Sequence, residues 1–193
     1  MKKIKQLYPP GDFGVWIIIY IELLTFGLFF IGFAYSRREQ LDLFNASQLL
    51  LDQRFGFINT ILLITSSFFI VKSIHIIKQN KIHTNIHNAS LYILSAIFLG
   101  VLFLIIKIIE FSDKYEQGIN LSTNTFFMFY FILTVFHFMH VLLGIIILYN
   151  LYRNTKNGLY THDNCQGLES GASYWHMVDL LWIILFPLVY IIR

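Results

Sequence analysis

Two pairs of side chains in this sequence are of types that bind metals or move protons, and each pair has helical spacing. His137 lies three residues before His140, and His176 lies three residues before Asp179. Residues at this spacing share one face of a helix, roughly 5–6 Å apart at Cβ. Imidazole and carboxylate groups ligate metals or transfer protons, and they are costly inside the apolar stretches that surround them here. We therefore expect both pairs to face protein rather than lipid.

Three further charged residues lie inside apolar stretches. Glu22 is about ten residues into the first stretch, roughly 15 Å along a helix and near the centre of a bilayer. It is either a neutral carboxyl hydrogen-bonded to a neighbouring helix or a proton-handling group. Lys107 and Glu110 are three residues apart, which suits an ion pair, and a structural role is favoured over a catalytic one.

Membrane-spanning helices must position these residues. Hydrophobic residues make up 56% of the 193-residue chain and charged residues 13%, well below the roughly 25% of soluble domains. The apolar runs are continuous and about twenty residues long, which predicts helices rather than strands. We expect an all-α polytopic bundle, with a cytoplasmic amino-terminal segment, 1–12, and a single transmembrane domain, 13–193, whose five spans are at about 13–35, 57–77, 88–111, 125–151 and 172–192.

Charge and cysteine usage bound the remaining possibilities. The net charge of +3 is scattered over the loops and does not indicate nucleic acid, and the single cysteine, Cys165, excludes an internal disulfide. Lys2, Lys3 and Lys5 precede the first span, which predicts a cytoplasmic amino terminus. An odd number of spans then places the carboxyl terminus outside. The charged loop 36–56 is expected to form a solvated face.

Two other functions are compatible with these residues. A haem-binding membrane cytochrome needs axial histidines on opposite sides of the haem. His137 and His140 lie one turn apart and cannot supply both, so His176 would have to join one of them. A proton-coupled carrier would use Glu22 with the lysine–glutamate pair, but the sequence has no inverted repeat of the kind common in such carriers.

Five segments resemble those of one membrane-protein family and occur in that family's order. The first two are the helix from Trp16 to Tyr35 with Glu22, Phe26 and Phe30, and Asn59-Thr60 with Leu62, Leu63, Ser66 and Ser67. The other three are Gly100-x-x-Phe103…Glu110-Phe111, Phe126-Phe127…Thr134-x-x-His137-x-x-His140-Val141-x-x-Gly144 and Glu169…Tyr174-Trp175-His176-Met177-Val178-Asp179-x-x-Trp182. On these motifs the chain is similar to subunit III of the haem-copper oxidases. The similarity covers nearly the whole chain from about residue 13 and implies the five-helix form of the family, corresponding to helices III–VII of its longer members.

The resemblance implies a non-catalytic accessory subunit of a bacterial respiratory oxidase or nitric oxide reductase, placed in the inner (cytoplasmic) membrane. Such a subunit supports assembly, stability and, indirectly, proton uptake. The resemblance also implies that haem and copper are held by partner subunits and not by this chain. The expected partners are the catalytic subunit I and membrane lipids, including a bound phospholipid.

The resemblance carries over polar positions but no catalytic residue and no metal ligand: Glu22, Glu110, His137, His140, Glu169, His176 and Asp179. It predicts that the histidines and Asp179 form one polar network between the fourth and fifth spans. Lys107 stands where a neutral polar residue is usual, Val135 replaces a glycine, and Phe186-Pro187 breaks the final helix. These departures favour the branch associated with nitric oxide reductase, with the oxidase branch as a close alternative.

Overall fold

The computed structural model describes residues 11–79, 86–161 and 164–192. The segment 1–10 lies outside the described residues, and so does most of the expected cytoplasmic segment, with Lys2, Lys3 and Lys5. Within the described part the chain is helical, and its elements are α1 (Phe13–Glu39), α2 (Leu41–Gln48), α3 (Gln53–Gln79), α4 (Ile86–Glu116), α5 (Thr125–Lys156), α6 (Gln166–Phe186) and the π-helix η2 (Pro187–Ile191).

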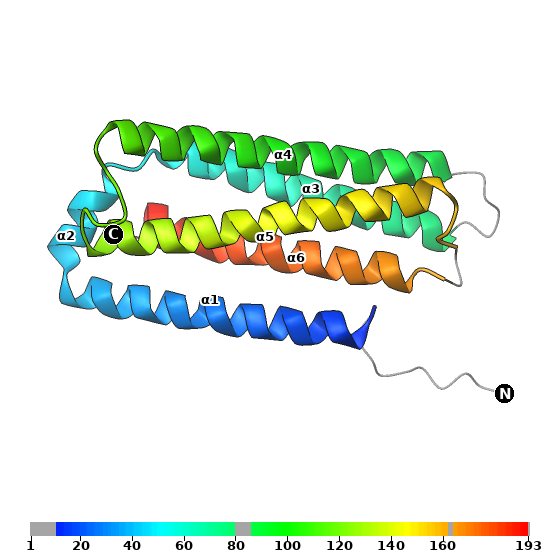
Figure 1. Cartoon of the computed structure of the whole chain (residues 1–193), viewed down its shortest axis with the longest axis horizontal. Helices are drawn as coiled ribbons and strands as arrows, with labels where there is room; N and C mark the ends of the chain where they lie inside the picture. Colours follow the sequence, from blue (N-terminus) through cyan, green and yellow to red (C-terminus); the bar gives the residue numbers. More distant parts are fainter. Residues whose placement is uncertain (1–10, 80–85, 162–163, 193) are drawn as a thin grey trace.

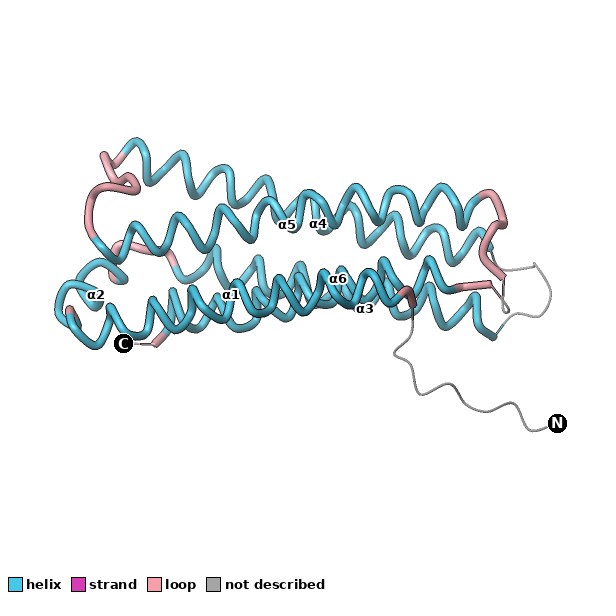
Figure 2. Tube along the Cα trace, turned by 60° about the horizontal axis from the view of Figure 1, so that its bottom comes forward, coloured by secondary structure: helices cyan, strands magenta, loops and turns pink. Residues whose placement is uncertain are grey.

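Five of these helices are long and apolar enough to cross a membrane, which confirms the predicted all-α polytopic bundle. They run side by side along the long axis of the molecule (Figure 1). In the turned view, α4 and α5 form one layer and α1, α6 and α3 the other (Figure 2). α6 contacts α1, α3 and α5. In the most apolar 18-residue stretch of each span, 50% of the residues are buried for the last span and 17% for α1. The last long helix is therefore the centre of the bundle, and α1 is its periphery.

Local sequence signals fix where the peripheral helix begins. The Asp12 side chain accepts a hydrogen bond from the Gly14 amide, as an N-cap residue does. The backbone amide of Asp12 donates to Ser170 Oγ at 2.7 Å, which ties the start of α1 to the first turn of α6. An alanine Cβ at Gly11 would meet Ser170 atoms at 2.8–3.0 Å, and its φ of +97° is one that glycine adopts readily. The first and last spans are thereby anchored to each other at one end.

The structure corrects two expectations about chain breaks. The loop 36–56 contains the helix α2, whose Phe44 is buried against Phe33 and Phe126, although charged residues such as Asp42 are exposed as expected. A single buried ring was too weak a signal to separate this short helix from a polar loop. The final helix does not break at Pro187 but continues as the π-helix η2. Proline is tolerated there because it is the first residue of η2. Proline has no backbone N–H, and an N–H at that position would have no acceptor within the helix.

Candidate functional site

The central helix reaches its neighbours because two glycines make room for a tryptophan. Trp175 of α6 is 1% exposed, and its indole lies against Gly100 of α4 and Gly144 of α5. Small residues allow helices to approach closely in membranes, where packing replaces the hydrophobic effect as the driving force. This contact fixes the rotation of α6 and hence the directions of His176 and Asp179.

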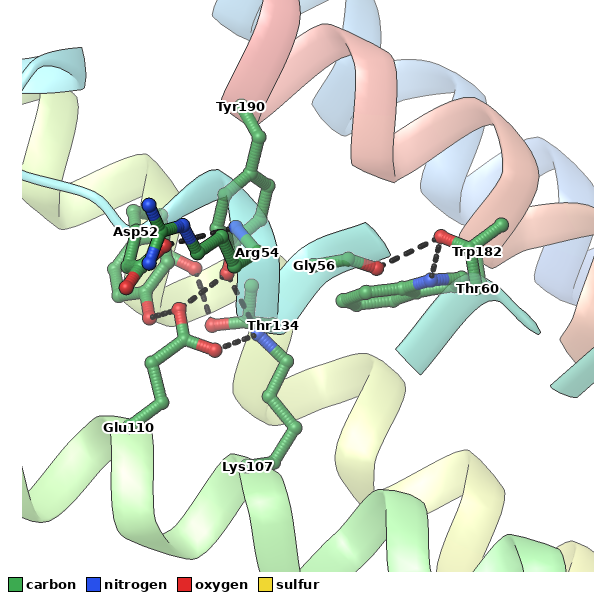
Figure 3. A network of polar contacts seen from close by, with 10 residues as sticks. Asp52, Arg54, Gly56, Thr60, Lys107, Glu110, Thr134, Trp182 and Tyr190 are labelled. Atoms are coloured by element: carbon green, nitrogen blue, oxygen red, sulfur yellow. Dashed lines mark hydrogen bonds and ion pairs between the residues drawn. The ribbon is translucent and has the colours of Figure 1, made fainter. Parts of the chain in front are cut away.

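A buried ion pair lies in the carboxyl-terminal half of α4, as its i,i+3 spacing predicts. Lys107 Nζ is 3.0 Å from Glu110 Oε2, and both side chains are 1% exposed. Two tyrosines complete the site: Tyr130 OH donates to Glu110 Oε1 at 2.8 Å, and Tyr190 OH donates to the same oxygen. Lys107 Nζ also donates to Tyr190 OH at 2.7 Å (Figure 3). The two opposite charges and their hydrogen bonds are enclosed together, as groups at this depth must be.

Aromatic rings enclose the Lys107 ammonium. Its Nζ lies 4.8 Å from the ring centroid of Trp182, 5.1 Å from that of Tyr190 and 5.8 Å from that of Tyr130. The negative faces of such rings attract a cation, most strongly where water is excluded. Trp182 is itself fixed, because its Nε1 donates to Thr60 Oγ1 at 3.0 Å (Figure 3). The charged groups of Lys107 and Glu110 are therefore enclosed by protein and do not reach the surface, which is typical of a structural ion pair.

A second polar pair joins α1 to α5. His140 Nε2 lies 3.0 Å from Glu22 Oε2, and the two side chains are 10% and 25% exposed. His140 Nδ1 faces the Phe136 carbonyl at 2.7 Å and so must carry a hydrogen to donate. One proton then lies between Nε2 and the carboxyl: on the imidazole it makes an ion pair, and on Glu22 it makes a neutral hydrogen bond. The polar partner of Glu22 on a neighbouring helix is His140, an arrangement compatible with both interpretations of Glu22.

The predicted single network of the histidines with Asp179 is wrong. His137 is 0% exposed, and neither ring nitrogen has a hydrogen-bond partner among the described residues. Its ring lies instead against Trp182 and Phe103, with centroids 5.2 and 5.7 Å away. His137 therefore contributes to the contact between α5 and α6 through its ring and not through hydrogen bonds.

The α6 pair turns toward α3 rather than α5. His176 Nδ1 lies 2.5 Å from Ser67 Oγ, and the Asp179 carboxyl also interacts with that hydroxyl. Residues three apart on a helix share a face but point about 60° apart. On α5 this difference in direction places His140 beside Glu22 and His137 beside Trp182. Spacing alone therefore does not identify the partners of the two histidines.

The remaining predicted position, Glu169, lies in the first turn of α6. Its carboxylate forms an ion pair with Lys78 Nζ at 2.5 Å, and this pair is partly exposed at the end of the bundle. No group of three His, Cys, Asp or Glu side chains that could hold a metal ion is present in the described ranges. His140 and His176 are directed to different helices, which does not favour their sharing a haem with His137.

Sequence reasoning missed three members of these sites. Tyr130 and Tyr190 were not among the predicted positions; both are 0% exposed, and their hydroxyls donate to Glu110. Ser67 was not among them either, and it contacts His176. A tyrosine inside a span is a signal worth following, because its hydroxyl needs a partner once it is buried.

Comparisons with known proteins identify the family of this chain. The family model described as "Cytochrome c oxidase subunit III" matches residues 11–193. "Cytochrome c oxidase subunit 3" of Synechocystis is 34% identical over 138 residues, which are 70% of this chain and 55% of that protein. "Probable quinol oxidase subunit 3" of Staphylococcus saprophyticus is 28% identical over 187 residues, 93% of this chain and 87% of that protein.

A third relative is a larger protein. "Heme-copper oxidase subunit I+III" of Aeropyrum pernix is 25% identical over 190 residues, which are 93% of this chain and 22% of that protein. The chain spans only about half the length of the Synechocystis relative. Because the family model covers the five spans and both polar pairs, the chain belongs to the cytochrome c oxidase subunit III family of the haem-copper oxidases.

Proposed function

We propose that this chain is a non-catalytic accessory subunit of a bacterial respiratory haem-copper terminal oxidase, bound in the inner membrane to the catalytic subunit I. The observation that carries the proposal is the Aeropyrum relative, in whose name subunits I and III are joined and to which 93% of this chain aligns. Haem and copper would then be held by the partner subunits. The polar groups of this chain would serve assembly, stability and the surroundings of proton uptake.

The Glu22–His140 pair supports an indirect role in proton uptake. It is the more exposed of the two intramembrane pairs, with Glu22 25% exposed on the peripheral helix α1. A polar pair at the edge of the bundle can come into direct contact with a neighbouring subunit, whereas the enclosed Lys107–Glu110 pair cannot. We place the amino terminus in the cytoplasm and the carboxyl terminus outside, on the lysines before the first span.

Phospholipid is the second proposed partner. A groove between α4 and α5 is lined almost entirely by apolar side chains, among them Phe111, Phe131 and Met139. It opens on the side of the bundle, and its size of about 770 Å³ suits an acyl chain. Its lining is of the kind that lipid tails contact.

Nitric oxide reductase is the alternative partner complex, favoured by one observation. Lys107 is a charged residue at a position where the oxidase subunits usually carry a neutral one, and here it is part of a closed network. The relatives reported above are named as oxidase subunits, which supports the oxidase instead.

Affinity purification from mild detergent, with partners identified by mass spectrometry, tests the proposal. We expect the chain to bring down a haem-copper catalytic subunit with a conserved stoichiometry, and the identity of that subunit decides between oxidase and nitric oxide reductase. Purified chain that carries its own stoichiometric haem, seen as a Soret band, would instead establish a cytochrome. Proton flux through vesicles containing only this chain would establish a carrier.

A further inference from the structure

The carboxyl end of the chain is held by side chains from other helices. Val189 and Tyr190 of η2 are both 0% exposed. Gln48 Nε2 of α2 donates to the Val189 carbonyl, and Gln53 Nε2 of α3 donates to the Tyr190 carbonyl, both at 2.8 Å. Carbonyls at a helix end have no following turn to pair with. Two long amide side chains supply those donors, so the end of η2 is anchored rather than frayed.

Tyr190 also completes the burial of the ion pair on α4. Its hydroxyl accepts from Lys107 Nζ at 2.7 Å and donates to Glu110 Oε1 (Figure 3). Of the two oxygen atoms that accept hydrogen bonds from Lys107 in the described part of the chain, one therefore comes from η2 and the other from Glu110. Polar groups in hydrocarbon must be satisfied within the protein. The ion pair is complete only when η2 is in place.

Tyr190 is made after α4, yet the ion pair on α4 depends on η2 for its burial. Tyr190 follows Glu110 by 80 residues. Chains fold from the amino-terminal side as they are made, so α4 enters the membrane with its two charges before their partner exists. Until η2 has been made, the Lys107–Glu110 pair lacks its hydrogen bonds with Tyr190.

We propose that η2 is a latch that closes the outer end of the bundle last. The docking of η2 is stabilised by the hydrogen bonds of Tyr190 with Lys107 and Glu110. When η2 is undocked, these two buried charged groups each lose a hydrogen-bond partner. Stable packing of α4, α5 and α6 around the pair therefore depends on η2 being docked. An apolar pair at the same positions would not depend on a hydrogen bond from η2.

Thiol labelling of the full chain in membranes tests the latch. Cys165 is the only cysteine, so Cys165→Ser with Val189→Cys gives one reporter thiol at a position that is 0% exposed in the closed latch. Tyr190→Phe keeps the ring and removes the hydroxyl. Labelling should accelerate at least roughly tenfold, the factor that loss of a hydrogen bond to a charged group is expected to give. Tyr149→Phe, at an exposed tyrosine outside the network, is the matched control and should leave the rate unchanged.

A charge-free background separates the latch from general loosening. With Lys107→Leu and Glu110→Leu together, Tyr190→Phe should change the labelling rate less than about twofold, because no charge is left to strand. Equal rates for Tyr190→Phe and Tyr149→Phe would overturn the proposal, and so would the same acceleration in the charge-free background. If Tyr190→Phe does not accumulate, the charge-free chain carrying it should accumulate. Failure of both chains would show that Tyr190 acts through packing alone.

Discussion

Gly144→Ala tests whether the fit of Trp175 holds the central helix in place. An alanine Cβ at Gly144 would lie 2.8 Å from Cε3 and 2.9 Å from Cζ3 of Trp175. The same indole is also close to α4, because a Cβ at Gly100 would lie 2.9 Å from its Cη2. Trp175 is 1% exposed. Since the buried ring is packed closely against both helices, the added methyl group is expected to push α5 and α6 apart.

Gly27→Ala gives the reference from which the size of the effect follows. A Cβ at Gly27 would meet nothing within 4 Å, so that variant gains helix propensity without a clash. The propensity gain is about 0.5–1 kcal/mol and is common to both substitutions. Overpacking of a confined core site costs roughly 1–3 kcal/mol. The free energies of unfolding of the two variants should therefore differ by about 1–3 kcal/mol, with Gly144→Ala the less stable.

Equilibrium unfolding of the purified variants in mixed micelles, by titration with a denaturing detergent, measures this difference. Trp175→Phe in the Gly144→Ala background should recover part of the loss, because the smaller ring leaves room for the methyl group. Gly144→Ala as stable as Gly27→Ala, or no recovery with Trp175→Phe, would show that the indole does not set the helix spacing.

Three further outcomes are expected. Lys107→Leu or Glu110→Leu alone should lower the free energy of unfolding by roughly 3–5 kcal/mol, and the double variant by much less; equal losses would refute the pairing. Glu22→Gln should keep assembly and the contact with His140, and any infrared band of a protonated Glu22 carboxyl should vanish with it. Partial burial, with a further contribution from a nearby carboxylate, raises the pKa of the Cys165 thiol, so impermeant maleimide should label it faster as pH rises, and only after intact cells are opened.

The fold was largely predictable from the sequence because hydropathy alone determines a span in a bilayer. The first four expected spans each lie within one long helix, and the last, 172–192, ends one residue beyond η2, which continues α6. Helix α2 was not predictable, since its only strong signal is Phe44, whose burial depends on Phe33 and Phe126 from distant parts of the chain. Local patterns cannot report a contact made by tertiary structure.

The site was predictable only where its partners share one helix. The pairing of Lys107 with Glu110 follows from spacing, and the structure confirms it. The partners of Glu22 and His176 lie on other helices, and no spacing identifies them. Glu22 pairs with His140, which was predicted to join the network of His176 and Asp179, and His176 contacts Ser67 instead. The rotation of each helix decides such pairings, and the contacts of Trp175 with Gly100 and Gly144 are one of the packing constraints on the rotation of α6.

The two intramembrane pairs differ in what they are able to do. The side chains of the Lys107–Glu110 pair are both 1% exposed and enclosed by aromatic rings. The side chains of the Glu22–His140 pair are 25% and 10% exposed, and Glu22 lies on α1, the least buried span. A group that affects a neighbouring subunit acts most directly where that subunit can contact it. The partly exposed pair between α1 and α5 is therefore the better placed for the proposed influence on a catalytic partner, and for the enclosed pair on α4 we propose a role in the stability of this chain.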